Sequence, residues 1–264
     1  MLPYRVAAGV AASAVILASC AKGPAPIVEV KGDCGDVFKA QVCTWAHTQG
    51  TTLVDVGATV PLASIENAPT APGSMTWPPA TEANLKLPDS VAARSGINHL
   101  TVYWEAGGHP PGAYMTPHWD FHFYDIPSAE RMAIDCKDLA KPSALPAGYG
   151  MPDVPLPPDV AKMIGVDTMI GLCVPQMGMH SAPAADLAST GTFRGTMVVG
   201  YYHSKPIFME PMLTREMLME KRSFDLPIEA VPGMTGPHPR TFHAEYDAQQ
   251  QQYQFTFSGF TSAN

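Results

Sequence analysis

Hydrophobic and polar residues alternate along several short segments of the chain, as they do in half-buried β-strands. The pattern is clearest in residues 98–105, where Leu100, Val102 and Trp104 would share one face of a strand. Comparable patterns predict strands at 51–58 (continuing through 60–65), 192–202, 207–210, 241–247 and 252–260. Because successive side chains of a strand point to opposite faces, each segment has one face for a core.

Helical signals are short and few. Asp89 and Ser90 are expected to begin one helical turn that ends at Gly96, and 159–164 predicts another brief helix. Ser128 is expected to cap a helix that runs to about residue 138, and Thr214 to cap one over 215–221. No segment predicts a helix longer than about three turns.

The chain has 27 proline and 22 glycine residues, and only 15% of its residues are charged. Segments 66–88 and 141–158 are so rich in proline that neither can form a long regular element. We therefore predict a mainly β fold, an antiparallel barrel or sandwich of cupin-like or lipocalin-like type, with a few short helices and long Pro-rich loops. A small β region at 27–88 would precede a main β domain at 89–264.

The first 20 residues have the pattern of a secretion signal, with Arg5 followed by an apolar stretch from residue 6 to residue 17. Residues 17–20 read LASC and resemble the lipobox of bacterial lipoproteins, which implies lipidation at Cys20. Residues 21–26 would then be a tether to the membrane, which is the expected partner. An ordinary cleaved signal peptide is the alternative, and either predicts a protein of the bacterial cell envelope that faces the periplasm or the exterior.

Four cysteines remain after Cys20, an even number in a compartment that permits disulfide bonds. Of the three possible pairings we prefer Cys34 with Cys43 and Cys136 with Cys173, since both bridges are then local. A zinc site made only of cysteines is disfavoured because no two of them have CxxC spacing. The net charge of −8, with no basic cluster, gives no support to nucleic-acid binding.

Potential metal ligands are most closely spaced at residues 117–124, which read PHWDFHFY. In a strand, His118, Asp120, His122 and Tyr124 would point one way, and the aromatic residues between them the other way. A solvent-facing strand would more often carry Lys, Glu, Thr or Ser on its polar side. The segment therefore predicts a lined pocket or metal site backed by a core.

Imidazole and carboxylate ligands suit a divalent metal outside the cytoplasm, and the candidate ligands are His118, Asp120, His122, His180 and Glu210. Positions i and i+4 of a straight strand lie about 13 Å apart, so His118 and His122 should not share one ion unless a bulge intervenes. We expect His122, with His118 or Asp120, to be joined by His180 and Glu210. The alternative is a metal-free, hydrogen-bonded network of buried His and Asp side chains.

Zinc is the predicted metal. Copper ranks second, because several of the 15 methionines lie close in sequence to the candidate ligands and thioethers favour Cu(I). The arrangement is similar to a cupin metal site, although the cupin spacing of two histidines at i and i+2 followed by a glutamate is absent. His109 in a Gly/Pro turn and Tyr124 are expected to line the pocket.

Three further segments accompany the octet: GHPP at 108–111, VPQMGMH at 174–180 and FMEPM at 208–212. Together they resemble a family of bacterial envelope proteins of unknown activity, over about residues 98–260. The resemblance implies a β-rich, homo-oligomeric protein. The sequence favours a lipid-anchored metal-binding protein, with a metal-dependent enzyme (a hydrolase or cupin-like enzyme) and a structural or ligand-binding protein as the alternatives.

Overall fold

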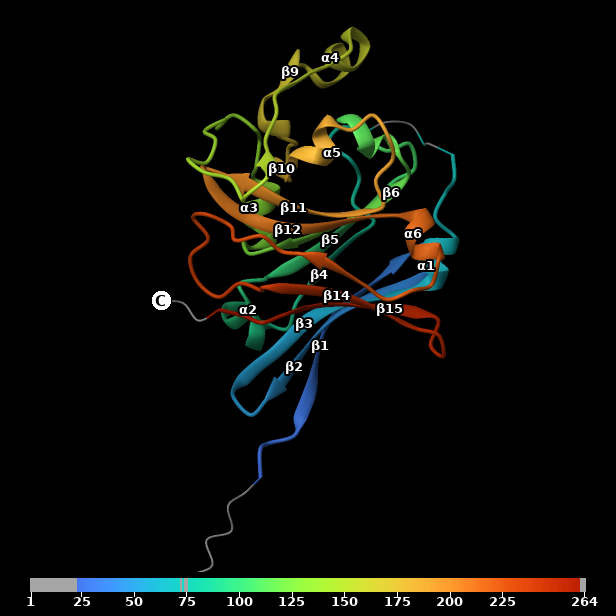
Figure 1. Ribbon diagram of the computed structural model, residues 1–264, viewed down its shortest axis with the longest axis vertical. Helices are drawn as coiled ribbons and strands as arrows, with labels where there is room; N and C mark the ends of the chain where they lie inside the picture. Colours follow the sequence, from blue (N-terminus) through green and yellow to red (C-terminus); the bar gives the residue numbers. More distant parts are fainter. Residues whose placement is uncertain (1–22, 72, 74–75, 262–264) are drawn as a thin grey trace, which may run out of the picture.

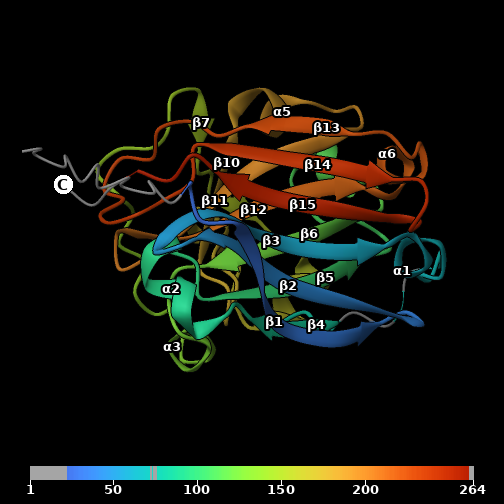
Figure 2. The same cartoon turned by 90° about the horizontal axis from the view of Figure 1, so that it is seen from below.

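Two antiparallel β-sheets pack face to face in the computed structural model, which describes residues 23–71, 73 and 76–261 (Figure 1). The first sheet has six strands in the order β1 (Ile27–Val37), β2 (Ala40–Gln49), β3 (Thr52–Pro61), β15 (Gln252–Ser258), β14 (Thr241–Asp247) and β13 (Phe224–Pro227). Figure 2 looks onto this sheet, with strands of the second sheet behind it.

The second sheet has seven strands and carries the residue octet. Its order is β4 (Ala83–Lys86), β5 (His99–Glu105), β6 (His118–Tyr124), β12 (Lys205–Thr214), β11 (Gly195–Tyr202), β10 (Met179–Pro183) and β7 (Tyr149–Gly150). Both sheets are open, with two edge strands each, so the prediction of a mainly β fold is confirmed as a sandwich, not a closed barrel.

Short helices and one small ribbon occupy the connections. The helices are α1 (Leu62–Glu66), α2 (Asp89–Ser95), η1 (Gly112–Met115), α3 (Ser128–Met132), α4 (Pro158–Ile164), η2 (Ile170–Leu172), α5 (Ala184–Ala188) and α6 (Arg215–Met219). The ribbon pairs β8 (Val154–Pro155) with β9 (Thr168–Met169). Within the residues described here, no helix combines the length and apolarity needed to cross a bilayer.

Strand β6 has an aromatic face in the core and an opposite face that carries the candidate ligands, as its alternation predicts. Trp119, Phe121 and Phe123 are buried in the main core between the sheets. The ring of Phe121 lies 5.0 Å from that of Phe255 on β15, in an edge-to-face arrangement. The opposite face of β6 lies under a layer of loops, α3 and α5, which forms the upper part of Figure 1.

The amino-terminal region differs from the prediction, because residues 27–61 form three strands where one was expected. Strand β1 is largely exposed and so lacks an apolar face that a pattern could reveal. The turn from β1 to β2 places Phe38 and Lys39 at positive φ, without the Asn-Gly signal usual for such a turn. Residues 62–66 are helical, not the continued strand expected there.

Two of the predicted helix starts have different outcomes. The side chain of Thr214 accepts a hydrogen bond from the backbone N–H of Met217, so this N-cap is confirmed. The N-cap of α3 is Pro127, and the Ser128 hydroxyl instead accepts from Asn84. Helix α3 also ends at Met132, earlier than expected, because the chain turns toward a disulfide.

Both predicted disulfides are present. Cys34–Cys43 links facing positions of β1 and β2, and Cys136–Cys173 ties the chain after α3 to the loop before β10. Such bonds are typical of an oxidising compartment outside the cytoplasm. Cys20 and the expected lipobox lie outside the described residues, and the described chain starts at the bottom of Figure 1.

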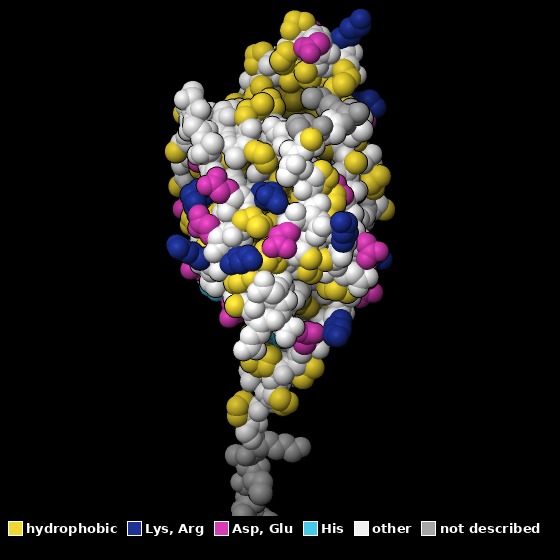
Figure 3. All heavy atoms as spheres, turned by 90° about the vertical axis from the view of Figure 1, so that its right-hand side faces the viewer, with side chains coloured by type: hydrophobic (Ala, Val, Ile, Leu, Met, Phe, Trp, Pro, Cys, Tyr) yellow, Lys and Arg dark blue, Asp and Glu magenta, His cyan; other side chains and the backbone are white. Residues whose placement is uncertain are grey.

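The boundary predicted between 27–88 and 89–264 is crossed by the first sheet, since β3 pairs with β15. The division of the chain into these two parts stays a prediction. The protruding segment around α4 exposes the apolar side chains of Met163 and Val166, and the face in Figure 3 intersperses acidic and basic side chains.

Replacing Phe121 by Ala should remove a fully buried ring from between the sheets. We expect the free energy of unfolding to fall by about 3–5 kcal/mol, because the substitution leaves a cavity in packed surroundings. Urea unfolding followed by fluorescence measures the change. Ile27→Ala, at an exposed position of β1, is the control and should change stability by no more than about 0.5 kcal/mol. Equal effects of the two substitutions would contradict the assignment of Phe121 to the core.

Candidate metal centre

The outer face of the second sheet, which points away from the first sheet, carries an unusual row of buried polar side chains. Pairing between β5 and β6 sets four residues of one strand opposite four of the other: His99 with Tyr124, Thr101 with His122, Tyr103 with Asp120, and Glu105 with His118. On the other side of β6, strand β12 adds Glu210 next to His122. The alternation seen in the sequence thus continues across three strands.

Three of the predicted ligands come together as a buried group, which we call the inner group: His122, His180 and Glu210. One ligand atom from each lies within 4.8 Å of the others. They come from β6, β10 and β12, and β10 reaches the site because His180 pairs with Gly200 of β11. His122 and Glu210 are almost fully buried.

The donor atoms of the inner group suit a metal. The Nδ1 of His180 lies 2.9 Å from the carbonyl oxygen of Leu172, which can only accept, so its Nε2 is left as a ligand. Among the described residues, neither ring nitrogen of His122 nor Oε2 of Glu210 has a hydrogen-bond partner, although His122 Nε2 and Glu210 Oε2 lie only 3.5 Å apart. Ligands of tetrahedral zinc with bonds of about 2.0–2.1 Å are separated by about 3.3 Å.

Burial governs the ionisation of the inner group. Burial raises the pKa of Glu210 well above its ordinary value, and the negative charges of Asp120 and Glu105 raise it further. Burial lowers the pKa of His122 well below its ordinary value and that of His180 to about 4. In the absence of a cation, both imidazoles of the inner group are therefore neutral at pH 7. Their lone pairs are then free to bind a metal.

His118 and Asp120 belong to a second group, the outer group, together with His109. The Nε2 of His118 lies 3.1 Å from one oxygen of Asp120, and the Nε2 of His109 lies 3.7 Å from the other. His118 is fully buried and Asp120 is 4% exposed, whereas the His109 side chain is 39% exposed. The outer group therefore borders on solvent, unlike the inner one.

These positions refine the ligand set expected from the sequence. As the rise of a strand requires, His118 and His122 fall into different groups. Neither His118 nor Asp120 joins the inner group, although one of them was expected there. His109, expected only to line a pocket, lies instead among candidate ligands. Tyr124 does lie on the site face, with its ring stacked 5.7 Å from that of His122.

Sequence reasoning missed the neighbours of the two groups. Arg131 of α3 is buried without a carboxylate partner among the described residues, and it donates to the hydroxyl of Tyr103 and the carbonyl of Gln176. Its charge helps to lower the pKa of His122. The alternation of residues 98–105 was a usable signal, because it also puts His99, Thr101 and Tyr103 on one face of the strand.

Phe208 positions both imidazoles of the inner group. Its ring lies 4.6 Å from that of His122 and 5.2 Å from that of His180. The ring occupies the space over Gly200, where an added Cβ would approach it to 1.8 Å. Glycine is therefore required at this point of β11.

Most of the methionines weighed as copper ligands pack elsewhere. Met179 and Met209 belong to the main core, and Met115 is exposed. Met212, in contrast, lies on the site face, opposite Asp120. The inner group thus offers nitrogen and oxygen donors, which suit zinc better than Cu(I).

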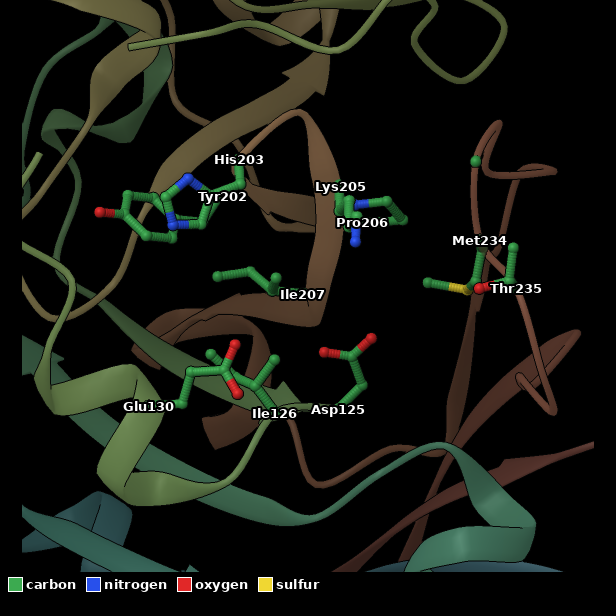
Figure 4. Close-up of a pocket in the computed structure, with 11 residues that line it drawn as sticks. Asp125, Ile126, Glu130, Tyr202, His203, Lys205, Pro206, Ile207, Met234 and Thr235 are labelled. Atoms are coloured by element: carbon green, nitrogen blue, oxygen red, sulfur yellow. The ribbon is translucent and has the colours of Figure 1, made fainter. Parts of the chain in front are cut away.

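Two surface pockets lie away from these groups. The larger, of about 280 Å³, is bordered by Asp125, Ile126 and Glu130 on one side and by Tyr202 and Lys205 on the other (Figure 4). Neither pocket includes a residue of the inner or outer group. The candidate metal centre is therefore set in the protein interior and not in either of these two pockets.

Comparison with protein families gives one match. A family model described as TTHB210-like, hypothetical protein TTHB210, matches residues 51–104, which run from the end of the β2–β3 turn through most of β5. The match stops short of every residue of the inner and outer groups. Neither the curated proteins nor the solved structures give a match. The chain is thus similar to this family over a fraction of its length.

His99 provides a test of the buried polar face. Burial, assisted by the charge of Arg131, lowers the pKa of His99 from 6.5 to about 4, so the folded protein holds this ring neutral. As the pH falls, His99 binds a proton in the unfolded chain before it does so in the folded protein. The free energy of unfolding therefore decreases between about pH 6.5 and pH 4, by on the order of 3 kcal/mol.

His99→Phe should remove this loss, since a phenyl ring cannot titrate and can keep the stacking on Tyr124. Urea unfolding of chelator-treated wild type and variant across this pH range measures the difference. The same pH dependence in both proteins would contradict a neutral buried His99.

Proposed function

We propose that this protein is an exported, lipid-anchored envelope protein that binds one zinc ion at the inner group. The observation that carries the proposal is the convergence of two imidazoles and one carboxylate from three strands, within 4.8 Å and with buried atoms that lack hydrogen-bond partners. A buried polar atom without a partner costs about 1–3 kcal/mol, and ligation of a cation would offset that cost.

The chemistry of the inner group favours zinc within this proposal. Two histidines and one glutamate form a known zinc ligand set, and the fourth position is then open to water or a small ligand. The bond from His180 Nδ1 to the Leu172 carbonyl is the type of outer contact that fixes the tautomer of a metal-binding histidine. Copper remains the second candidate metal, on the basis of Met212.

Export and anchoring are supported by two separate features. The two disulfides fit an oxidising compartment, and the lipobox-like residues 17–20 precede the chain segment that leads into β1. The site-bearing sheet is the upper one in Figure 1, whereas β1 begins at the bottom. A tether at residues 21–26 would hold the first sheet toward the membrane and the metal centre away from it.

The open fourth position also favours a second candidate function, a metal-dependent enzyme of the hydrolase or cupin-like class. A zinc ion there would activate water or polarise a carbonyl. No residue of the inner group lines either of the two surface pockets described above, so these pockets provide no substrate site beside the metal, and we favour binding without turnover.

Zinc content is the direct test. We expect purified protein to retain zinc, and both His180→Ala and Glu210→Gln to lower the content by one equivalent per chain, because each removes a ligand. Plasma mass spectrometry measures this after dialysis against metal-free buffer. His99→Phe is the matched control, as it replaces a buried imidazole of the same face that lies outside both groups. Unchanged zinc in both ligand variants would refute the inner site.

Zinc binding should also release a proton from Glu210. Because burial and nearby charges raise its pKa, the carboxyl group holds its proton to a higher pH than an ordinary glutamate, and the metal must displace it. Calorimetric titrations in buffers of different ionisation enthalpy count the protons released. Zinc affinity should therefore increase with pH, and Glu210→Gln should abolish this proton release. Release that is equal in wild type and variant would assign the proton to another group.

A further inference from the structure

We infer that the outer group, His109 with His118 and Asp120, is a second divalent-cation site of the zinc class, separate from the inner site and in exchange with solvent. It uses none of the inner ligands, so it stands or falls independently of the function proposed above. Four features support this site: the hydrogen bonds of the two Nδ1 atoms, the spacing of the ligand atoms, the charge around them and their access to solvent.

The backbone fixes the tautomers of both imidazoles. The Nδ1 of His109 lies 2.8 Å from the carbonyl oxygen of Pro110, and that of His118 lies 2.6 Å from the carbonyl oxygen of Thr116. A carbonyl oxygen only accepts hydrogen bonds, so each Nδ1 carries a proton, and Nε2 is the nitrogen of each ring that can bind a metal. Both Nε2 atoms lie close to oxygens of Asp120, so three possible ligand atoms of the outer group come together.

The spacing agrees with ligation. The two Nε2-to-oxygen separations of 3.1 and 3.7 Å bracket the separation of about 3.3 Å between ligands of tetrahedral zinc. A hydrogen-bonded ion pair between His118 and Asp120 is the rival explanation. Against it, the buried Nε2 of His118 and Oδ1 of Asp120 both lack a hydrogen-bond partner among the described residues, despite their closeness. The two atoms are close but not aligned for a hydrogen bond.

Charge favours a cation at the same place. Asp120 is 4% exposed, and its ion pairs among the described residues are with imidazoles alone. Glu105 lies opposite His118 in the register and adds a second carboxylate nearby. Two carboxylates close together beneath a protein surface repel each other, and a divalent ion between the ligands would relieve that repulsion.

Access distinguishes the outer site from the inner one. His109 is 39% exposed and lies on the loop that follows β5. Hydrogen bonds from the Gly108 N–H to Glu105 and from the His109 N–H to Tyr114 hold this loop. Gly108 has a φ of 64°, and an added Cβ would lie 2.3 Å from the carbonyl oxygen of Tyr114. The imidazole is thus held in place at the surface, where an ion can enter and leave past it.

The test is a zinc titration of chelator-treated full-length protein, followed by calorimetry. Wild type should bind two equivalents per chain, with the outer ion removed first by a competing chelator. His109→Ala should bind one, His180→Ala should bind one, and the double variant should bind none. His243→Ala is the matched control, since this histidine is similarly exposed and also pairs with an aspartate, Asp225.

The outcomes separate the two sites. Loss of one equivalent in His109→Ala supports the outer site, and it does so even if His180→Ala binds as much zinc as wild type and the inner site is thereby shown to be absent. Zinc binding that is the same in His109→Ala and wild type overturns the proposal and leaves the outer group as an ion-pair network. A second variant, Asp120→Asn, which keeps the side-chain shape, must reproduce the loss, and failure to do so also overturns the proposal.

Discussion

Burial of an entire polar strand face is the constraint on which this structure depends. Strand β6 places large aromatic side chains between the two sheets, and the pleat then forces His118, Asp120 and His122 into the opposite interior layer. Buried imidazole and carboxylate atoms need partners, and several on β6 lack hydrogen bonds among the described residues: His118 Nε2, Asp120 Oδ1 and both ring nitrogens of His122. Metal cations are the partners that best match the type and spacing of these ligand atoms. The alternation of β6 thus accounts both for the core between the sheets and for the proposed metal sites.

The covering layer makes that burial possible. Loops between β6 and β12 lie over the outer face, and the Cys136–Cys173 bridge and the Arg131–Gln176 hydrogen bond tie two of them together. The same segment delivers His180 to the inner group through its pairing with β11. A disulfide in this position stabilises the cover by restricting the unfolded chain, which fits a protein that folds in an oxidising compartment.

The inner and outer groups share one strand but differ in exposure, and this difference sets their expected behaviour. The inner group is almost fully buried at His122 and Glu210, and the rings of Phe208 and Tyr124 pack against His122. The outer group includes a histidine that solvent reaches. One protein would thus combine a retained ion with an exchangeable one on the same sheet face, an arrangement that suits either metal storage or chemistry at the exposed ion.

The sequence by itself determined the elements with local signals. The period of two assigned the faces of β6, the cysteine positions indicated the bridges, and the ligand types pointed to a metal. Strands β1 and β2 were not predicted, because the exposed strand β1 has no apolar face and the turn between the two strands has no glycine. Only the tertiary structure decided which ligands belong together. It moved His109 into a ligand group and left His118 and Asp120 out of the group that contains His122, because strand register and loop closure depend on residues far apart in the chain, whereas the pleat of a strand is fixed by its immediate neighbours.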